Sequence, residues 1–146
     1  MLKKSLPIAI AAILLLTSCA GANMADPLSV TQTFYEDWAA YEGDPVADRA
    51  YAESDLVTEA FADKTDALMS AGGDIIGDPV FCTLEVPEAF SAETEPDLSD
   101  ESTTVVTVRE RIGERELVIT VSLLLTDDEW RIDSIHCPAA GSAQAR

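Results

Sequence analysis

Two stretches of the chain repeat apolar residues at the spacing of an α-helix. The first begins at Asp26-Pro27, where a capping acid precedes a proline suited to the first helical position, and ends at Gly43-Asp44-Pro45. The second follows a candidate cap at Ser54 and ends at Gly72-Gly73. Residues 46–53 between them suggest a short helical turn. The two apolar stripes consist of Val30, Phe34, Trp38 and Tyr41, and of Val57, Phe61, the stem of Lys64, and Leu68.

After Gly77-Asp78-Pro79 the apolar period changes from that of a helix to that of a strand. Residues 80–86 alternate apolar and polar side chains as far as Pro87, which predicts a short strand. Residues 88–102 contain Pro96 and six acids, and this composition predicts a solvated loop.

The last third of the chain predicts a three-stranded antiparallel meander with turns at Ile112-Gly113 and Asp127-Asp128. Oppositely charged residues would then face one another in three successive cross-strand pairs, which favours this register. The pairs are Arg111 with Glu114, Glu110 with Arg115, and Arg109 with Glu116. One face of the sheet would be apolar, and it would comprise Val106, Val108, Leu117, Ile119, Val121, Leu123, Leu125, Trp130 and Ile132. Cys137 would lie on the other, mixed face, beside Val118.

The apolar sheet face needs a cover, and the two helices with aromatic stripes supply one. The sequence therefore predicts an α+β fold, in which N-terminal helices pack on a curved antiparallel sheet of about four strands. Residues 27–138 would form a single domain, and residues 139–146, which are small and polar, a disordered tail.

Length and charge narrow the classes of function. The chain has 146 residues, with 27 acidic and 9 basic side chains and a net charge of −18. A nucleic-acid partner is excluded, because phosphate backbones are bound by clusters of Lys and Arg. A single His and three scattered Cys exclude the common zinc constellations, and no Gly-rich phosphate loop or EF-hand spacing is present. We therefore expect no metal and no cofactor.

The amino terminus predicts export from the cytoplasm. Lys3 and Lys4 precede an apolar run over residues 6–16, which is typical of a secretory signal peptide and short for a transmembrane helix. The following Leu16-Thr17-Ser18-Cys19 resembles the lipobox of bacterial lipoproteins. This resemblance implies a signal peptide over residues 1–18, and a Cys19 that carries diacylglycerol and an N-acyl chain such as palmitate. A plain secretory signal with a coincidental Cys is the alternative.

On this interpretation the protein is a membrane-anchored lipoprotein of the bacterial cell envelope that faces the periplasm. Residues 19–26 would be the lipidated Cys and a small, flexible tether. Removal of residues 1–18 takes away two lysines and no acid, which leaves 7 basic against 27 acidic residues, or −20. Cys82 and Cys137 would remain in an oxidising compartment, where an even pair predicts a disulfide. Two separate buried thiols are the alternative.

Three motifs resemble the DUF3828 family of bacterial envelope proteins over about residues 28–138. They are Phe34-Tyr35-Glu36-Asp37-Trp38, Asp78-Pro79 followed by Cys82, and Trp130-Arg131-Ile132 followed by Cys137. The order of helices and then sheet is also that of the cystatin-like and nuclear-transport-factor-2-like cone folds. The resemblance implies such a fold and an envelope setting. It supplies no catalytic residues, because the family is itself uncharacterised.

Two classes of function follow from the residues. His136, placed on the helix-facing side of the sheet, could form an acid–base pair with Tyr35 or Tyr51 in a small-pocket isomerase or dehydratase. The alternative role for His136 is structural, at the end of the sheet. We expect instead a non-catalytic module that binds an envelope protein or a small apolar ligand. A homodimer through the mixed sheet face is a further possibility. A filled cone with an exposed apolar patch would favour the binding module.

Overall fold

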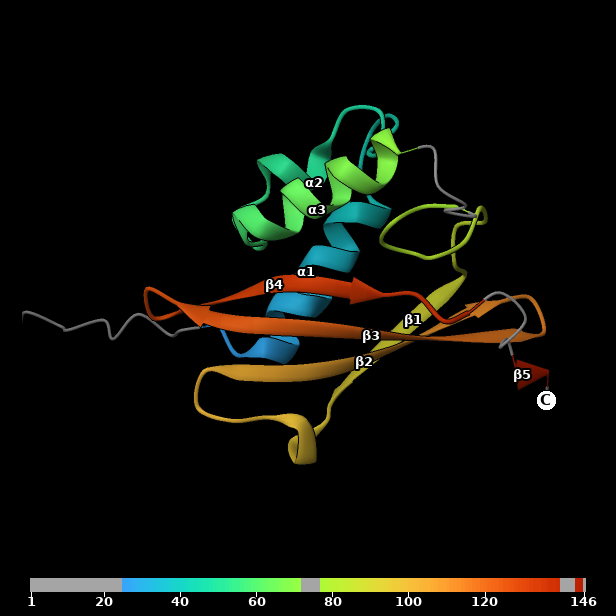
Figure 1. The fold of residues 1–146 in the computed structure, drawn as a ribbon. Helices are drawn as coiled ribbons and strands as arrows, with labels where there is room; N and C mark the ends of the chain where they lie inside the picture. The colour runs from blue at the N-terminus through green and yellow to red at the C-terminus, as the bar shows by residue number, and fades with distance from the viewer. Residues whose placement is uncertain (1–24, 72–76, 140–143, 146) are drawn as a thin grey trace, which may run out of the picture.

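The computed structural model describes residues 25–71, 77–139 and 144–145, and it has the predicted α+β architecture. A four-strand antiparallel sheet, in the order β1-β2-β3-β4, carries its helices on one face (Figure 1). The signal peptide, Cys19 and most of the tether lie outside the described residues. The elements are α1 (Pro27–Ala39), α2 (Ala50–Glu53), α3 (Glu59–Ser70), β1 (Ala89–Thr94), the 3-10 helix η1 (Pro96–Leu98), β2 (Thr103–Ile112), β3 (Arg115–Thr126), β4 (Glu129–His136) and β5 (Gln144–Ala145).

Helix α1 begins as predicted. The Asp26 carboxylate accepts the backbone N–H of Ser29 at 3.0 Å and its hydroxyl at 2.8 Å, which satisfies an otherwise unpaired donor of the first turn. The predicted stripe is buried through Trp38. Its last member, Tyr41, lies beyond the helix and is 38% exposed, so its prediction as a core residue was wrong.

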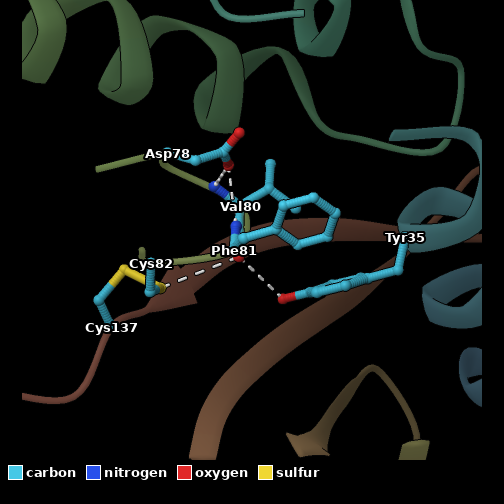
Figure 2. The surroundings of a disulfide bond; sticks show 6 residues. All are labelled: Tyr35, Asp78, Val80, Phe81, Cys82 and Cys137. Carbon is cyan, nitrogen blue, oxygen red and sulfur yellow. Dashed lines mark hydrogen bonds between the residues drawn. A yellow bond between two sulfur atoms is a disulfide. The ribbon is translucent and has the colours of Figure 1, made fainter. Parts of the chain in front are cut away.

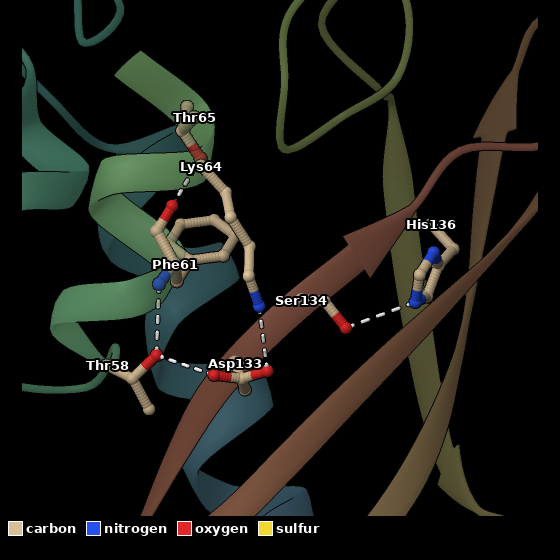
Figure 3. A network of polar contacts seen from close by, with 7 residues as sticks. All are labelled: Thr58, Phe61, Lys64, Thr65, Asp133, Ser134 and His136. Carbon is tan, nitrogen blue, oxygen red and sulfur yellow. Dashed lines mark hydrogen bonds and ion pairs between the residues drawn. The ribbon is translucent and has the colours of Figure 1, made fainter. Parts of the chain in front are cut away.

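Helix α3 begins later than predicted. Thr58, not Ser54, is its cap, and the Thr58 hydroxyl oxygen accepts the N–H of Phe61 at 3.0 Å while donating to Asp133 at 2.9 Å (Figure 3). The helix buries Phe61 and Thr65 rather than Lys64 and Leu68, which are exposed. The phase of the predicted stripe was wrong because Val57 precedes the helix and bridges to Ile132 of β4. The short turn expected within 46–53 is α2.

The predicted strand over residues 80–86 is absent, and the sheet's first strand lies instead in the predicted loop. Asp78 folds the following residues into a turn, and Cys82 adopts a left-handed φ of 56°, which is incompatible with a strand. Strand β1 pairs with β2 from Ala89 opposite Arg111 to Thr94 opposite Val106. The backbone groups along this side of β2 need partners, and β1 satisfies them although acidic residues flank it on both sides.

The meander forms, but its first hairpin is shifted by two residues from the predicted register. Gly113 and Glu114 make the turn, with Gly113 at a φ of 59°, so that Ile112 pairs with Arg115 and Glu110 with Leu117. A shift of two residues keeps every side chain on its predicted face. The helix-facing side accordingly buries Val106, Val108, Ile119, Val121, Leu123 and Ile132. Of the three predicted charge pairs, the Arg109–Glu116 ion pair is present, at 3.7 Å across a diagonal.

The second hairpin turns at Asp127-Asp128 as predicted, and then contains a bulge. Leu123 pairs with Ile132, but the residue before Leu123 in β3, Ser122, pairs with Ser134. Asp133 is therefore the extra residue of the bulge. Asp133 accepts the Thr58 hydroxyl, and Lys64 reaches its other oxygen at 3.2 Å (Figure 3). Beyond the bulge the faces of β4 are exchanged relative to the prediction.

The carboxyl terminus differs from the predicted disordered tail where the structure describes it. Gln144 and Ala145 form β5, which pairs with Glu116 and Arg115 of β3. The pairing of β4 with β3 ends at Thr120, so Arg115 and Glu116 have no partner in β4. The returning chain pairs with this free edge of β3.

An aromatic cluster joins the three helices above the sheet. Phe34 of α1 lies with its ring centroid 6.0 Å from that of Trp38 and 6.3 Å from that of Phe61. Tyr51 of α2 completes the cluster, 6.3 Å from Trp38 and 6.4 Å from Phe61. This packing fixes the positions of α2 and α3 relative to α1.

Candidate functional site

A disulfide fixes the loop that precedes the sheet. Cys82 and Cys137 are bonded, with their Cα atoms 5.4 Å apart and a sequence separation of 55. The bond ties residues 77–88, here called the disulfide loop, to the chain that leaves β4 (Figure 2). Closing a loop of this length restricts the unfolded chain and so stabilises the fold.

Asp78 organises the disulfide loop from within. One carboxylate oxygen accepts the N–H groups of Val80 and Phe81 at 2.7 and 2.8 Å, and the other accepts the indole N–H of Trp38 at 2.9 Å. The preceding Gly77 has a φ of 123°, and a Cβ there would lie 2.4 Å from the carbonyl carbon of Thr83. Only glycine fits this position, where the two ends of the turn over residues 77–83 approach each other closely.

Tyr35 anchors the same loop from helix α1. Its side chain is fully buried, and its hydroxyl donates to the carbonyl oxygen of Val80 at 3.2 Å (Figure 2). The ring lies 6.1 Å from Phe81 and 5.5 Å from Phe90, between centroids. Burial, followed by the negative charges of Glu110 and Asp78, raises the pKa of Tyr35 well above its ordinary value, so the phenol stays protonated.

Glu110 is a buried acid that the sequence analysis placed in a charge pair. It is fully buried on the helix-facing side of β2, and neither carboxylate oxygen has a hydrogen-bond partner among the residues that the structure describes. Burial, and then the charge of Asp78, raises its pKa to about 8. The signal was present in the alternation Val106, Val108, Glu110, Ile112, which puts the carboxyl on the apolar face.

The three candidate catalytic residues do not come together. His136 was predicted to face the helices, but the bulge at Asp133 turns it to the exposed face, where its Nε2 lies 3.1 Å from Ser134 Oγ in a hydrogen bond (Figure 3). Tyr51 donates to Asp66 at 2.7 Å, and Asp66 also binds Arg49. Tyr35 binds Val80, as described above, so each candidate has separate partners.

Three adjoining hollows flank helix α1, mostly along its C-terminal half; together they are called the α1 groove. Their volumes are about 440, 230 and 170 Å³, and neighbouring hollows share lining residues such as Phe81, Ala39, Trp38 and Tyr41. Tyr35 and Glu110 line none of the three. The smallest is bordered by the most exposed apolar side chains of the disulfide loop, Leu84 and Val86, which are 82% and 72% exposed.

Acidic side chains line every part of the α1 groove. Each hollow has two, and none of the three is lined by a Lys, Arg or His. Glu85 and Glu88 are held by Arg115 and Arg111 in exposed ion pairs. The full acidic set is Glu36 and Glu88, Asp37 and Glu53, and Asp78 and Glu85. The groove thus combines apolar contact area with acidic side chains.

We predict that replacing Glu110 with Gln removes a pH-dependent loss of stability. The unfolded carboxyl ionises near 4.5, whereas the folded one keeps its proton to about 8, so wild-type stability falls as pH rises through this window. The difference in free energy of unfolding between Glu110→Gln and wild type should grow by a few kcal/mol from pH 4.5 to pH 8. Urea unfolding at a series of pH values measures it. The exposed Glu101→Gln is the matched control, and a flat difference curve would contradict the assignment.

We predict that the double variant Cys82→Ser/Cys137→Ser lowers the free energy of unfolding by roughly 4 kcal/mol, from the loop-closure entropy that the disulfide removes. Urea unfolding of both proteins without reductant gives the value. Amide exchange should accelerate most in residues 77–88, with α1 retaining its protection. Equal unfolding midpoints for the two proteins would show that the cross-link contributes no stability.

Comparisons with protein-family models, with curated proteins and with solved structures found no match to this chain. Within residues 25–71, 77–139 and 144–145, no helix has the length and apolar character needed to cross a membrane. The same residues contain no group of three or more His, Cys, Asp or Glu side chains arranged to hold a metal ion. The chemistry and geometry of the α1 groove and the disulfide loop are therefore the basis for assigning a function.

Proposed function

We propose that this protein is a lipid-anchored, non-catalytic binding module of the bacterial cell envelope, and that its α1 groove docks a basic, apolar segment of a partner protein. The observation that carries the proposal is the exposure of Leu84 and Val86 beside an acidic groove. Exposed large apolar side chains that gather at a hollow are typical of interaction sites.

The apolar border of the groove is pre-organised for binding. Leu84 and Val86 lie in a loop that is fixed by the disulfide, by the Asp78 carboxylate and by the Tyr35 hydroxyl. Covering each side chain would contribute about 1.5–3 kcal/mol, and a loop that is already ordered loses little entropy on binding. The geometry therefore favours a partner that inserts apolar side chains between α1 and this loop.

Charge selects the kind of partner. Six acids and no basic residue line the groove, and the whole chain carries a net charge of −18. A field of this sign attracts basic segments and repels acidic ones during encounter. We therefore commit to a basic, apolar polypeptide segment as the occupant, in preference to a small neutral ligand or a second acidic copy of this chain.

The surroundings of the candidate catalytic residues support a non-catalytic role. His136 is exposed and hydrogen-bonded to Ser134, and among the residues that the structure describes no Tyr or carboxylate forms a hydrogen bond with it. Tyr35 and Glu110 are near enough to interact electrostatically, but both side chains are fully buried. Acid–base catalysis requires such groups to reach a substrate.

The anchor and the groove would lie at opposite ends of helix α1. The proposed lipid on Cys19 leads through residues 20–26 to Pro27, the first residue of α1, whereas the groove flanks mainly the later part of this helix. A 13-residue helix is about 20 Å long. A strongly acidic domain is repelled by anionic headgroups, so a tether would hold the groove away from the bilayer.

We predict that a photo-crosslinking amino acid at position 84, in the full chain expressed with its own amino terminus, forms a discrete adduct with a partner protein. The position borders the groove and is exposed, so the substitution should leave the fold intact. Mass spectrometry of the adduct should place the cross-link in a segment rich in Lys or Arg and in apolar residues. The adduct should decrease at least fivefold in a Val86→Ser background, because this change removes apolar contact and leaves the charge of the groove unchanged.

The matched control is the same amino acid at position 98, because Leu98 is 63% exposed on η1 and lines no part of the groove. An adduct that forms equally at both positions would contradict the docking site. An adduct with a second copy of this chain would replace the proposed partner with a homodimer, and a cross-linked segment without basic residues would contradict the charge argument.

We predict that Cys19→Ser releases the protein from the membrane fraction and prevents the mass increase of diacylglycerol and acyl chains. Two or three fatty chains anchor a protein stably, because each buried CH₂ contributes about 0.8 kcal/mol. Fractionation and intact mass measurement of both proteins test this. Replacement of Ser18 by Gly, another small residue, should leave acylation unchanged. Equal fractionation of the Cys19→Ser variant and wild type, with no lipid on either, would contradict the proposed lipid anchor.

A further inference from the structure

The second largest of the three hollows of the α1 groove lies between α1 and α2 and is lined by aromatic rings. Its volume is about 230 Å³, below the 300 Å³ that drug-sized ligands usually require and in the range of a single side chain. Phe34 and Trp38 of α1 line one side of it, together with Tyr41, which follows the helix. Ala50, Glu53 and Ser54 line it from α2 and its C-terminal end.

The aromatic walls are held in fixed positions. Trp38 is tied by its indole N–H to Asp78 at 2.9 Å, and its ring packs 6.3 Å from Tyr51. Phe34 contacts the rings of Trp38 and Phe61. Tyr41 is the exposed member, and its hydroxyl donates to Asp48 at 3.3 Å. The hollow therefore presents the Tyr41 ring and the small exposed parts of Phe34 and Trp38 to whatever enters it.

Two carboxylates complete the lining. Asp37 and Glu53 are both exposed, and no Lys, Arg or His of the described chain lies within ion-pair distance of either. The nearby Arg49 is engaged by Asp66, with its Nε 2.8 Å from a carboxylate oxygen. Burial, and then the charge and hydrogen bond of Asp48 and the charge of Glu53, raise the pKa of the Tyr41 phenol.

We propose that the α1–α2 hollow binds an alkyl cation, namely the side chain of a Lys or Arg in the docked segment. The aliphatic stem would pack on Phe34, Trp38 and Tyr41, and the ammonium or guanidinium would pair with Asp37 and Glu53 at the rim. Aromatic rings and carboxylates together favour an organic cation over a neutral ligand of the same shape. The proposal deepens the proposed function and rests on it for the identity of the occupant.

The test uses the full exported chain, ¹⁵N-labelled in nonionic detergent micelles at neutral pH and constant ionic strength. The probes are n-butylammonium, n-propylguanidinium and the neutral n-butanol. We expect saturable shifts of the Trp38 indole N–H and of the Asp37, Tyr41 and Glu53 amides with both cations, and an affinity for n-butanol at least about tenfold lower. Asp37→Asn and Glu53→Gln should each raise the dissociation constant about threefold, and the double variant about tenfold.

Asp63→Asn is the matched control, because Asp63 is exposed on α3 and lines no part of the groove. It should leave the affinities unchanged. Equal affinities for n-butylammonium and n-butanol, or an equal effect of Asp63→Asn and Glu53→Gln, would overturn the cation site. The probes bind without a partner protein, so saturable cation binding with no cross-linked partner would contradict the proposed function alone. Cross-linking without cation binding would contradict only the hollow.

Discussion

The rest of the candidate site depends on the hydrogen bonds that the Asp78 carboxylate accepts. It accepts three hydrogen bonds, two from the backbone of its own loop and one from the indole of Trp38. A loop without regular secondary structure is thereby joined to the longest helix, and the disulfide at Cys82 joins the same loop to the end of β4. These two attachments hold the disulfide loop, which carries the apolar border of the α1 groove, and the Asp78 carboxylate also holds Trp38 of its aromatic wall.

The burial of Glu110, by contrast, lowers the stability of the folded state when its carboxyl is ionised. A carboxyl that is closed off from water and without a hydrogen-bond partner is stable only in its neutral form, and the negative Asp78 nearby strengthens that preference. Apolar packing of Tyr35, Phe81 and Phe90 around this region must offset the cost. The acid thus lies in the part of the core that supports the disulfide loop.

The acidic side chains of the surface fall into two groups. Most of the acidic side chains lie on exposed positions, where they interact weakly and are screened by salt. Around α1, however, acidic side chains adjoin apolar ones and no basic residue lines the hollows. On the sheet, by contrast, Arg109 is paired with Glu93 and Arg131 with Glu129.

By itself the sequence determined the α+β class, helix α1 with its cap at Asp26, and the disulfide. It also determined which side chains of the meander face the helices as far as the bulge at Asp133. Each of these depends on local periodicity, local capping or the pairing of two cysteines. Tertiary structure alone decided what depends on contacts between distant segments. Thr58 replaced Ser54 as a cap because Asp133 of β4 lies beside it. The bulge at Asp133 carried His136 to the exposed face, and pairing with β2 made residues 89–94 a strand. No pattern along the chain contains these contacts, because they arise only when the helices and the sheet pack together.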